Sequence, residues 1–379
     1  MASIRKRKFG PNKDREAWVV DYVDQYGKRH IKTFKLKKDA DDFVTTVRQE
    51  VREGIHTPAG KSITVAQAAE DWLAYIAGEG RERSTLVSYK LHVRIHIIPR
   101  LGNEKLAKLT TPRIQALRDE LVKSMSRAMA KKVLTSLKAI LKDAKRRGNV
   151  AQNVASDVSI TNHGRTKKLE VGIDIPTRAE IQRIVDAAEP GKGRALLLTA
   201  ALTGMRASEL RGLRWSDVDL NGRQIHVRQR ADFWRKIGQP KSAAGTRTIP
   251  IGEMVVNTLR QWKLQCPKGL QDLVFPTRVG TVEYLANMVQ RYVQPAQVTA
   301  GVVDSEGKAK YAMHALRHFY ASWCINRKAD GGLELPPKTV QARLGHSSIV
   351  MTLDRYGHLF PARDDGNELA AAERALFAT

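Results

Sequence analysis

Ala201-Leu-Thr-Gly-Met-Arg-Ala-Ser-Glu-Leu210 combines a glycine turn, an arginine and the start of a helix. Gly204 allows the chain to turn tightly into a helix that contains Glu209, because glycine adopts backbone conformations that other residues avoid. Arg206 therefore lies close to the beginning of that helix. An arginine at such a position is usually a solvated helix residue, so a functional role for it depends on the other residues that gather around it.

Three shorter motifs follow: His314-Ala-Leu-Arg-His318, Leu344-Gly-His346 and Tyr356-Gly-His358. A lone tyrosine is usually a packing residue with one wet end, and a lone loop histidine is usually inert. Together, however, the four motifs contain arginines, histidines and a tyrosine. These are residue types that bind a phosphodiester and attack it.

The composition favours a polyanionic partner. The 379 residues include 65 Lys+Arg against 39 Asp+Glu, a formal net charge of +26 at pH 7, and such a charge indicates attraction to nucleic acid. Cys266 and Cys324 form no Cys-x-x-Cys pair, which argues against a disulfide scaffold or a cysteine zinc site. Neither a membrane helix nor a secretory signal is recognisable. We expect a soluble, intracellular protein of a reducing compartment that is not associated with a membrane.

Missing motifs exclude several catalytic classes. The chain has no Gly-x-x-x-x-Gly-Lys-Ser/Thr loop and no Gly-x-Gly-x-x-Gly after a strand, so no nucleotide cofactor is expected. The pairs His92/His96 and His314/His318 lack the glutamate of a His-Glu-x-x-His zinc site, and no carboxylate cluster predicts a two-metal nuclease. We expect neither cofactor nor metal. Metal-free phosphoryl transfer then needs arginines for the phosphate, a general acid for the leaving oxygen and a covalent nucleophile.

Changes in composition divide the chain into four parts. We expect a small DNA-binding domain at 1–60, a helical domain at 61–160, a linker at 161–175 and a mixed domain at 176–379. The most basic part per residue is 61–170, with 22 Lys+Arg against 10 Asp+Glu. We expect this part to contact phosphates.

The first part predicts two strands and a helix. Ala17–Val23 and Arg29–Phe34 are rich in β-branched and aromatic residues, and the turn Gln25–Lys28 lies between them. Apolar residues at helical spacing predict a helix from about Lys38 to Glu53, which Gly54 ends.

The second part predicts helices alone. Thr64-x-x-Gln67 resembles a capping box, a helix over Ser84–Ile98 is ended by Pro99 and Gly102, and Thr111-Pro112 begins another. The last helix has a basic face made of Lys131, Lys132, Lys138, Lys142, Lys145, Arg146 and Arg147. A charged face is often only solvated, but one sign dominates here, and we therefore expect it to face DNA.

The mixed domain predicts helices around a small sheet. Thr177-Arg-Ala-Glu180 is a capping box that opens a helix over 178–188, and a second helix covers 192–203. Asn221-Gly222 predicts a hairpin-type turn, and a basic hairpin spans about 226–251. The rest of the domain is predicted to be mostly helical.

The four motifs resemble those of the tyrosine recombinases, and their layout is most similar to phage and integrative-element integrases. The resemblance implies a multidomain fold that is mainly α with small β-sheets. It implies a small N-terminal β-sheet-plus-helix domain of the arm-type DNA-binding kind, a helical core-binding (SAM-like) domain and a mixed α+β tyrosine-recombinase catalytic domain. The segment 367–377 is expected to be a tail helix, which relatives dock onto a neighbouring protomer.

The resemblance also implies a role for each residue of the site. Arg206 and Arg317 would clamp the scissile phosphate, and Tyr356 would be the nucleophile. His314 would hydrogen-bond the phosphate or assist proton transfer. His346 would donate a hydrogen bond to a non-bridging oxygen.

A lysine and three auxiliary residues complete the expected site. Lys241, followed by Thr-Arg-Thr-Ile-Pro, resembles the hairpin lysine that protonates the departing 5′ oxygen, and Lys236 is a nearby competitor. His318 is expected to orient the pocket, His358 is a further auxiliary residue, and Glu209 is expected to pair with nearby arginines.

The function implied by the resemblance is that of an integrase. It cleaves and rejoins double-stranded DNA through a 3′-phosphotyrosyl intermediate, as a homotetramer, at core-type and arm-type attachment sites. The resemblance also implies a DNA-bending protein and an excisionase as candidate accessory partners, and a place in the bacterial cytoplasm in association with the nucleoid. Two alternatives stay open: type IB topoisomerase-like relaxation, and a non-catalytic DNA-binding regulator.

Overall fold

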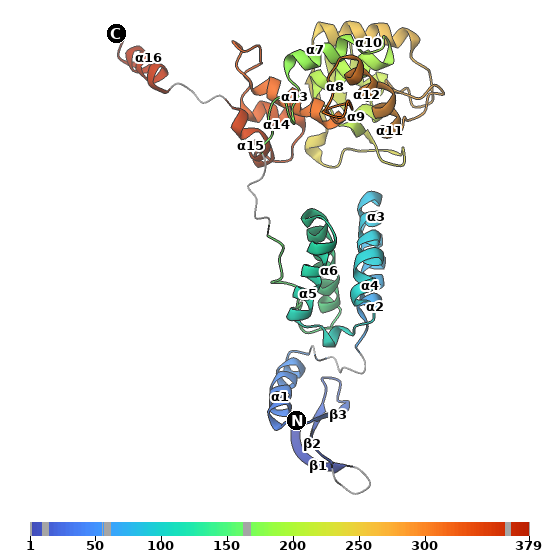
Figure 1. Cartoon of the computed structure of the whole chain (residues 1–379), viewed down its shortest axis with the longest axis vertical. Coiled ribbons are helices and arrows are strands. Elements are labelled where there is room, and N and C mark those ends of the chain that lie inside the picture. Colours follow the sequence, from blue (N-terminus) through green and yellow to red (C-terminus); the bar gives the residue numbers. More distant parts are fainter. Residues whose placement is uncertain are drawn as a thin grey trace. The chain divides into compact units, whose positions relative to one another are not determined.

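The protein is described here by a computed structural model that covers residues 2–9, 15–54, 56, 62–161, 168–360 and 365–378 (Figure 1). The chain divides into two compact units, Met1–Arg165 and Thr166–Thr379. Both are mainly helical with small antiparallel sheets, which confirms the predicted fold class. Within the described residues, no helix is long and apolar enough to cross a membrane.

The first unit begins with a three-stranded antiparallel sheet, β1 (Ala2–Phe9), β2 (Arg15–Val23) and β3 (Arg29–Phe34), followed by helix α1 (Lys37–Arg52). Apolar residues of β2 and α1 form a core of their own. The sequence predicted β2, β3 and α1 but not β1. Among the described strands, β1 is an edge strand that pairs with β2. Most of its side chains are exposed and half of them are charged, as is typical of an edge strand, so it lacks the apolar alternation that reveals a strand.

The rest of this unit is helical, as predicted. Its α-helices are α2 (Val65–Gly78), α3 (Arg83–Leu91), α4 (Ile98–Leu101), α5 (Thr111–Ser124) and α6 (Arg127–Arg146). The capping box before α2 is present, because the Thr64 hydroxyl accepts the Gln67 N–H and the Gln67 side chain accepts the Thr64 N–H. These helices enclose a second core, separate from that of the sheet.

The expected stop at Pro99 is wrong. The helix that begins at Arg83 continues through a π-helical turn, His92–Ile97, into α4, and Pro99 occupies the first turn of α4. The change in hydrogen-bond register places the proline where a missing N–H costs least. Gly102 follows α4 directly, and a Cβ added to it would lie 2.6 Å from the Ile98 carbonyl oxygen.

The second unit packs most of its helices around one large core. Its α-helices are α7 (Arg178–Asp186), α8 (Lys192–Thr203), α9 (Ala207–Gly212), α10 (Glu253–Gln265), α11 (Leu285–Met288), α12 (Gln294–Thr299), α13 (Met313–Ile325), α14 (Pro337–Leu344), α15 (Ile349–Tyr356) and α16 (Asp365–Phe377). The Thr177–Glu180 capping box opens α7, and α16 confirms the predicted C-terminal helix. Contacts join α13 to α14 and α14 to α15, and Figure 1 shows the three together.

The predicted basic hairpin is two separate ladders. The strands of the unit are β4 (Val218–Asp219), β5 (Gln224–Val227), β6 (Arg230–Ala231), β7 (Ile237–Gly238) and β8 (Arg247–Pro250). β5 pairs with both β4 and β8, whereas the described residues place β6 and β7 in a two-stranded sheet of their own. A loop therefore leaves β7 and returns at β8, and Lys241 lies on that loop.

The last part of the predicted linker is packed against the second unit. Leu169 and Ile175 are buried in its core, and Val171 forms a bridge with Ile175. The end of the 161–175 segment thus contributes apolar residues to this core. The sequence did not predict this, because the segment shows neither helical nor strand periodicity.

Candidate active site

The glycine turn before Arg206 also binds the side chain of Arg317. Gly204 ends α8 with a left-handed backbone (φ 60°), and a Cβ added to it would lie 2.4 Å from Cδ1 of Tyr320. Any other residue would meet both a backbone penalty and the tyrosine ring. The Gly204 carbonyl accepts a hydrogen bond of 2.6 Å from Nη1 of Arg317, which lies on α13.

Arg206 and Arg317 converge on one turn. The buried Glu209 carboxylate accepts the backbone N–H of Arg206 and its Nη1, each at 2.8 Å. Nη2 of Arg206 donates to the Gly345 carbonyl at 3.0 Å, and Nη2 of Arg317 donates to the Leu344 carbonyl at 2.6 Å. Two guanidinium groups from distant motifs are therefore held beside the turn that precedes His346.

The ring of His346 is oriented by a buried hydroxyl. Gly345 has a left-handed backbone (φ 66°), and Nδ1 of His346 lies 2.9 Å from Oγ1 of the fully buried Thr352. Burial, with Arg317 and Arg206, lowers the pKa of His346 to about 4, so the ring is neutral at pH 7. A neutral imidazole that accepts the threonine hydroxyl at Nδ1 carries its proton on Nε2, where it can donate to a phosphate oxygen.

Tyr356 is buried among these groups at the end of α15. Its hydroxyl lies 2.7 Å from Nδ1 of His318, and its ring stacks on that of His346 with an interplanar angle of 7°. Burial raises the pKa of Tyr356, while Arg317 and Arg355 oppose the shift. Burial and neighbouring positive groups lower the pKa of His318 to about 4, so this ring is also neutral at pH 7 and its Nδ1 can accept a hydrogen bond from the phenolic O–H.

His314 stands beside the same pocket on α13. Its ring centroid lies 4.7 Å from that of His318, in an edge-to-face arrangement. The ring is solvent-accessible, yet partial desolvation, Arg317 and Arg206 lower its pKa. Burial and Arg206 likewise lower the pKa of Arg317 to about 9. The cluster concentrates positive charge, and an anion bound there would relieve the repulsion.

Three predicted residues are not part of this cluster. Lys241 is exposed on the loop between β7 and β8, and its side chain makes no hydrogen bond or ion pair with the described residues. Lys236, the competitor, lies at the exposed turn between β6 and β7. His358 is expected to be an auxiliary residue of the site, but within the described residues its Nε2 donates to the Leu169 carbonyl at 2.8 Å and no hydrogen bond joins it to the cluster.

Two residues of the site were missed by sequence reasoning. Thr352 orients His346, and Arg247 binds Glu209 through both Nη atoms, at 3.1 and 2.9 Å. Neither residue belongs to one of the four motifs. A clue was available for Arg247, because it lies in the Thr-Arg-Thr-Ile-Pro segment after Lys241.

The basic face of α6 divides into two groups. Arg146 and Arg147 bind the buried Asp143, Arg146 stacks on Tyr75 at 4.1 Å, and Lys138 donates to a backbone carbonyl. Among the described residues of this face, those whose exposed side chains make no hydrogen bond or ion pair are Lys131, Lys132, Lys142 and Lys145. The second group is the better candidate for phosphate contacts.

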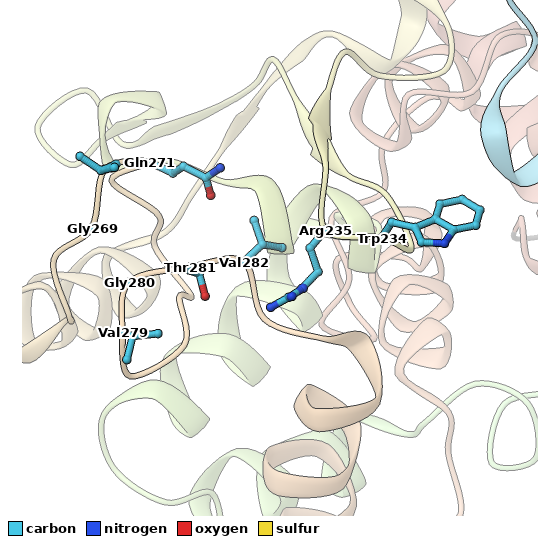
Figure 2. A pocket seen from close by; sticks show the side chains of 9 residues that line it. Trp234, Arg235, Gly269, Gln271, Val279, Gly280, Thr281 and Val282 are labelled. Atoms are coloured by element: carbon cyan, nitrogen blue, oxygen red, sulfur yellow. The ribbon is translucent and has the colours of Figure 1, made fainter.

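A separate cavity of about 510 Å³ lies at the tip of the β6–β7 hairpin (Figure 2). It is lined by Trp234, Arg235, and the loops 269–271 and 279–282, and Figure 2 shows the Trp234 ring pointing away from Val282. None of the arginines, histidines or the tyrosine described above lines it. Among the described residues, no group of three or more His, Cys, Asp or Glu is placed to hold a metal ion.

Comparison with known proteins identifies the family. The model of the phage integrase family matches residues 176–363, and that of the phage integrase N-terminal SAM-like domain matches residues 64–122. The chain belongs to the tyrosine recombinases of the phage integrase family. It is therefore a site-specific DNA recombinase of the integrase type, an enzyme that cleaves and rejoins DNA strands.

Relatives span almost the full length of this recombinase. It is 27% identical over 367 residues to a "Tyrosine recombinase XerC-like" protein of Caldanaerobacter subterraneus subsp. tengcongensis, covering 89% of this chain and 90% of the relative. It is 27% identical over 382 residues to an "Integrase" of Streptomyces ambofaciens, covering 94% of each.

Solved structures of integrases share its fold. The Tn1549 transposon integrase in complex with circular intermediate DNA superposes with a TM-score of 0.62 at 21% identity, covering 83% of this chain and 100% of that one. The lambda integrase tetramer bound to a Holliday junction superposes with a TM-score of 0.58 at 20% identity, covering 90% of this chain and 97% of that one.

Proposed function

We propose that this recombinase integrates or excises a mobile element by a 3′-phosphotyrosyl mechanism in which Tyr356 is the nucleophile. The observation that carries the proposal is the meeting of four motifs in one cluster of side chains. Arg206 and Arg317 donate to carbonyls of the turn before His346. The Tyr356 ring stacks on that of His346, and its hydroxyl contacts His318. Such a cluster offers an anion site and a nucleophile together.

In the proposed reaction, the phosphate lies between the two guanidinium groups. Arg206, Arg317 and the Nε2–H of His346 donate to its non-bridging oxygens, and His314 donates from the rim of the pocket. These donors stabilise the charge that grows on the phosphate as it is attacked, and they are already in place before the reaction. The positive charge that stabilises the attacked phosphate therefore comes from the two arginines.

Tyr356 attacks the phosphorus as its hydroxyl proton passes to Nδ1 of His318, whose pKa rises once the bound phosphate anion offsets the surrounding cations. The Tyr356 oxygen–phosphorus bond forms, and the bond between phosphorus and the 5′ oxygen breaks. Lys241 donates the proton that the departing 5′ oxygen needs. The free 5′ hydroxyl of the partner duplex then attacks the phosphotyrosyl bond, which returns the tyrosine and joins the new strand.

The assembly proposed for this reaction is a homotetramer on double-stranded DNA, in the cytoplasm at the nucleoid. The solved lambda integrase tetramer bound to a Holliday junction motivates it. We assign 1–60 to arm-type sites and 61–160 to core-type sites, with a linker at 161–175 and the catalytic domain at 176–379. Their separate apolar cores support the division between the first two. A bending protein and an excisionase remain proposed partners.

A recombination assay tests this proposal against the two alternatives. Nicked and intact duplexes tiled across the DNA that flanks this chain's own gene would be incubated with the full-length protein, EDTA and no ATP. Exchange between two specific duplexes is the expected result. Relaxation of supercoiled plasmid without site preference would instead indicate a type IB topoisomerase. Binding without any strand cleavage would indicate a regulator.

A further inference from the structure

Arg247 joins three parts of the site that are distant in the sequence. Arg247 is the first residue of β8, and its side chain is only 6% exposed. Nε donates to the Arg343 carbonyl at 2.7 Å, immediately before the Leu344–His346 turn. Nη1 donates to the Gly245 carbonyl at 2.9 Å, and Nη1 and Nη2 both bind Glu209. One guanidinium group thus contacts the β7–β8 loop, the α14 end and α9.

The loop that Arg247 holds is compact and includes the neighbour of Lys241. Gly245 closes a short turn by donating its N–H to the Ser242 carbonyl at 2.8 Å. A Cβ added to Gly245 would lie 2.5 Å from Cβ of Pro240, so the two ends of the loop touch. Because Pro240 directly precedes Lys241, the backbone of Lys241 is coupled to the position of Gly245.

The same loop presses against the turn before His346. A Cβ added to Gly345 would lie 2.8 Å from the Ala244 carbonyl oxygen and 2.9 Å from Nη1 of Arg247. The close approach of these backbones leaves room only for glycine at Gly345. The turn before His346 and the lysine loop are therefore in direct contact, and Arg247 donates one hydrogen bond to the loop and one to Arg343, the residue just before the turn.

We propose that Arg247 is a positioning residue that fixes the loop bearing Lys241 against the turn bearing His346, and so places the general acid relative to the phosphate. The proposal rests on the function proposed above for Lys241. An arginine suits the task because its planar fork donates in several fixed directions at once, whereas a lysine acts as a point charge. Exact placement matters because a shift of about 1 Å can cost about 100-fold in rate.

The test compares two leaving groups. The flanking-gene duplexes that wild-type protein cleaves would be prepared with an ordinary 5′ oxygen or with a bridging 5′ sulfur at the scissile phosphate. A thiolate leaves without a proton, so cleavage of the sulfur duplex does not need a general acid. Arg247→Lys retains a charge opposite Glu209 but cannot keep all the hydrogen bonds of the fork. Formation of covalent protein–DNA complex is measured for both duplexes.

Arg247→Lys is expected to slow cleavage of the oxygen duplex by about 100-fold, the lower range for general acid catalysis, and to recover most of that loss on the sulfur duplex. Lys241→Ala should behave in the same way. The double variant should be no slower than Lys241→Ala alone. Cleavage of the sulfur duplex also demonstrates that each variant is folded.

The matched control is Arg223→Lys, since Arg223 pairs with Glu253 at the exposed end of the same sheet. It should cleave both duplexes like the wild type. If Arg247→Lys slows cleavage of both duplexes equally while sulfur rescues Lys241→Ala, the positioning role of Arg247 is refuted and the general acid role of Lys241 stands. A Lys241→Ala variant that sulfur does not rescue refutes the general acid, and the inference fails with it.

Discussion

Gly204→Ala should lower both the stability of the second unit and its cleavage activity. The left-handed backbone of Gly204 costs an alanine about 1–2 kcal/mol. The new Cβ would also lie 2.4 Å from the Tyr320 ring, and overpacking of this kind costs about 1–3 kcal/mol more. The expected loss is therefore about 2–5 kcal/mol in the free energy of unfolding.

Gly301→Ala separates the two contributions. Gly301 has a similar backbone (φ 65°), but a Cβ added to it meets nothing within 4 Å. This control should lose only the backbone contribution, about 1–2 kcal/mol. Thermal and urea unfolding of both variants measure the difference between them, which is the steric contribution at Gly204.

Cleavage assays complete the comparison. The Gly204 carbonyl holds Arg317, so a displaced turn moves one arm of the phosphate clamp. Gly204→Ala should cleave nicked duplex more slowly than wild type under conditions where it is folded, whereas Gly301→Ala should cleave at the wild-type rate. Equal stability of the two variants, together with unchanged cleavage by Gly204→Ala, would refute the reasoning.

Acidification should destabilise the protein through its buried histidines. The pKa values of His318 and His346 are lowered to about 4 in the fold, so the unfolded chain binds more protons between about pH 4 and 6.5. Each histidine should therefore lower the free energy of unfolding by up to about 3 kcal/mol as the pH falls through this window. The melting temperature of the His318→Gln, His346→Gln double variant should depend less steeply on pH than that of the wild type, and an unchanged dependence would contradict the assignment. Thr352→Val should slow cleavage about 10-fold or more by releasing the His346 ring, with little change in DNA affinity; unchanged single-turnover cleavage would contradict it. If Lys142 contacts a phosphate, Lys142→Gln should reduce the slope of log K against log salt by about 0.9, whereas Arg146→Gln, whose partners are internal, should change that slope less; equal slopes for both would remove the distinction.

Local signals in the sequence predicted much of the helical framework. The capping boxes at Thr64 and Thr177 and the helical period of α6 depend on residues three or four apart, and such patterns are visible in the sequence. The edge strand β1 and the π turn before Pro99 were missed. In both cases the deciding feature is a partner or a hydrogen-bond register that adjacent residues do not reveal.

The site was predicted in its residue types and in the pairing of Glu209 with an arginine, but not in its other supporting contacts. The motifs identified Arg206, Arg317, His346 and Tyr356, and the structure brings all four together. The role of Arg247 depends on the backbone carbonyl of Arg343, 96 residues away, and no local pattern carries that information. The hydrogen bond between His318 and Tyr356 is equally long-range.

Covalent trapping on nicked duplex DNA tests the central claim most directly. Full-length wild-type protein and Tyr356→Phe would be incubated with the duplexes tiled across the flanking DNA, in EDTA without ATP, and then denatured. The account predicts a denaturation-resistant protein–DNA complex, linked through a 3′ phosphate to Tyr356, for the wild type alone. A complex of equal yield with Tyr356→Phe, or tight binding by the wild type with no complex on any duplex, would contradict it.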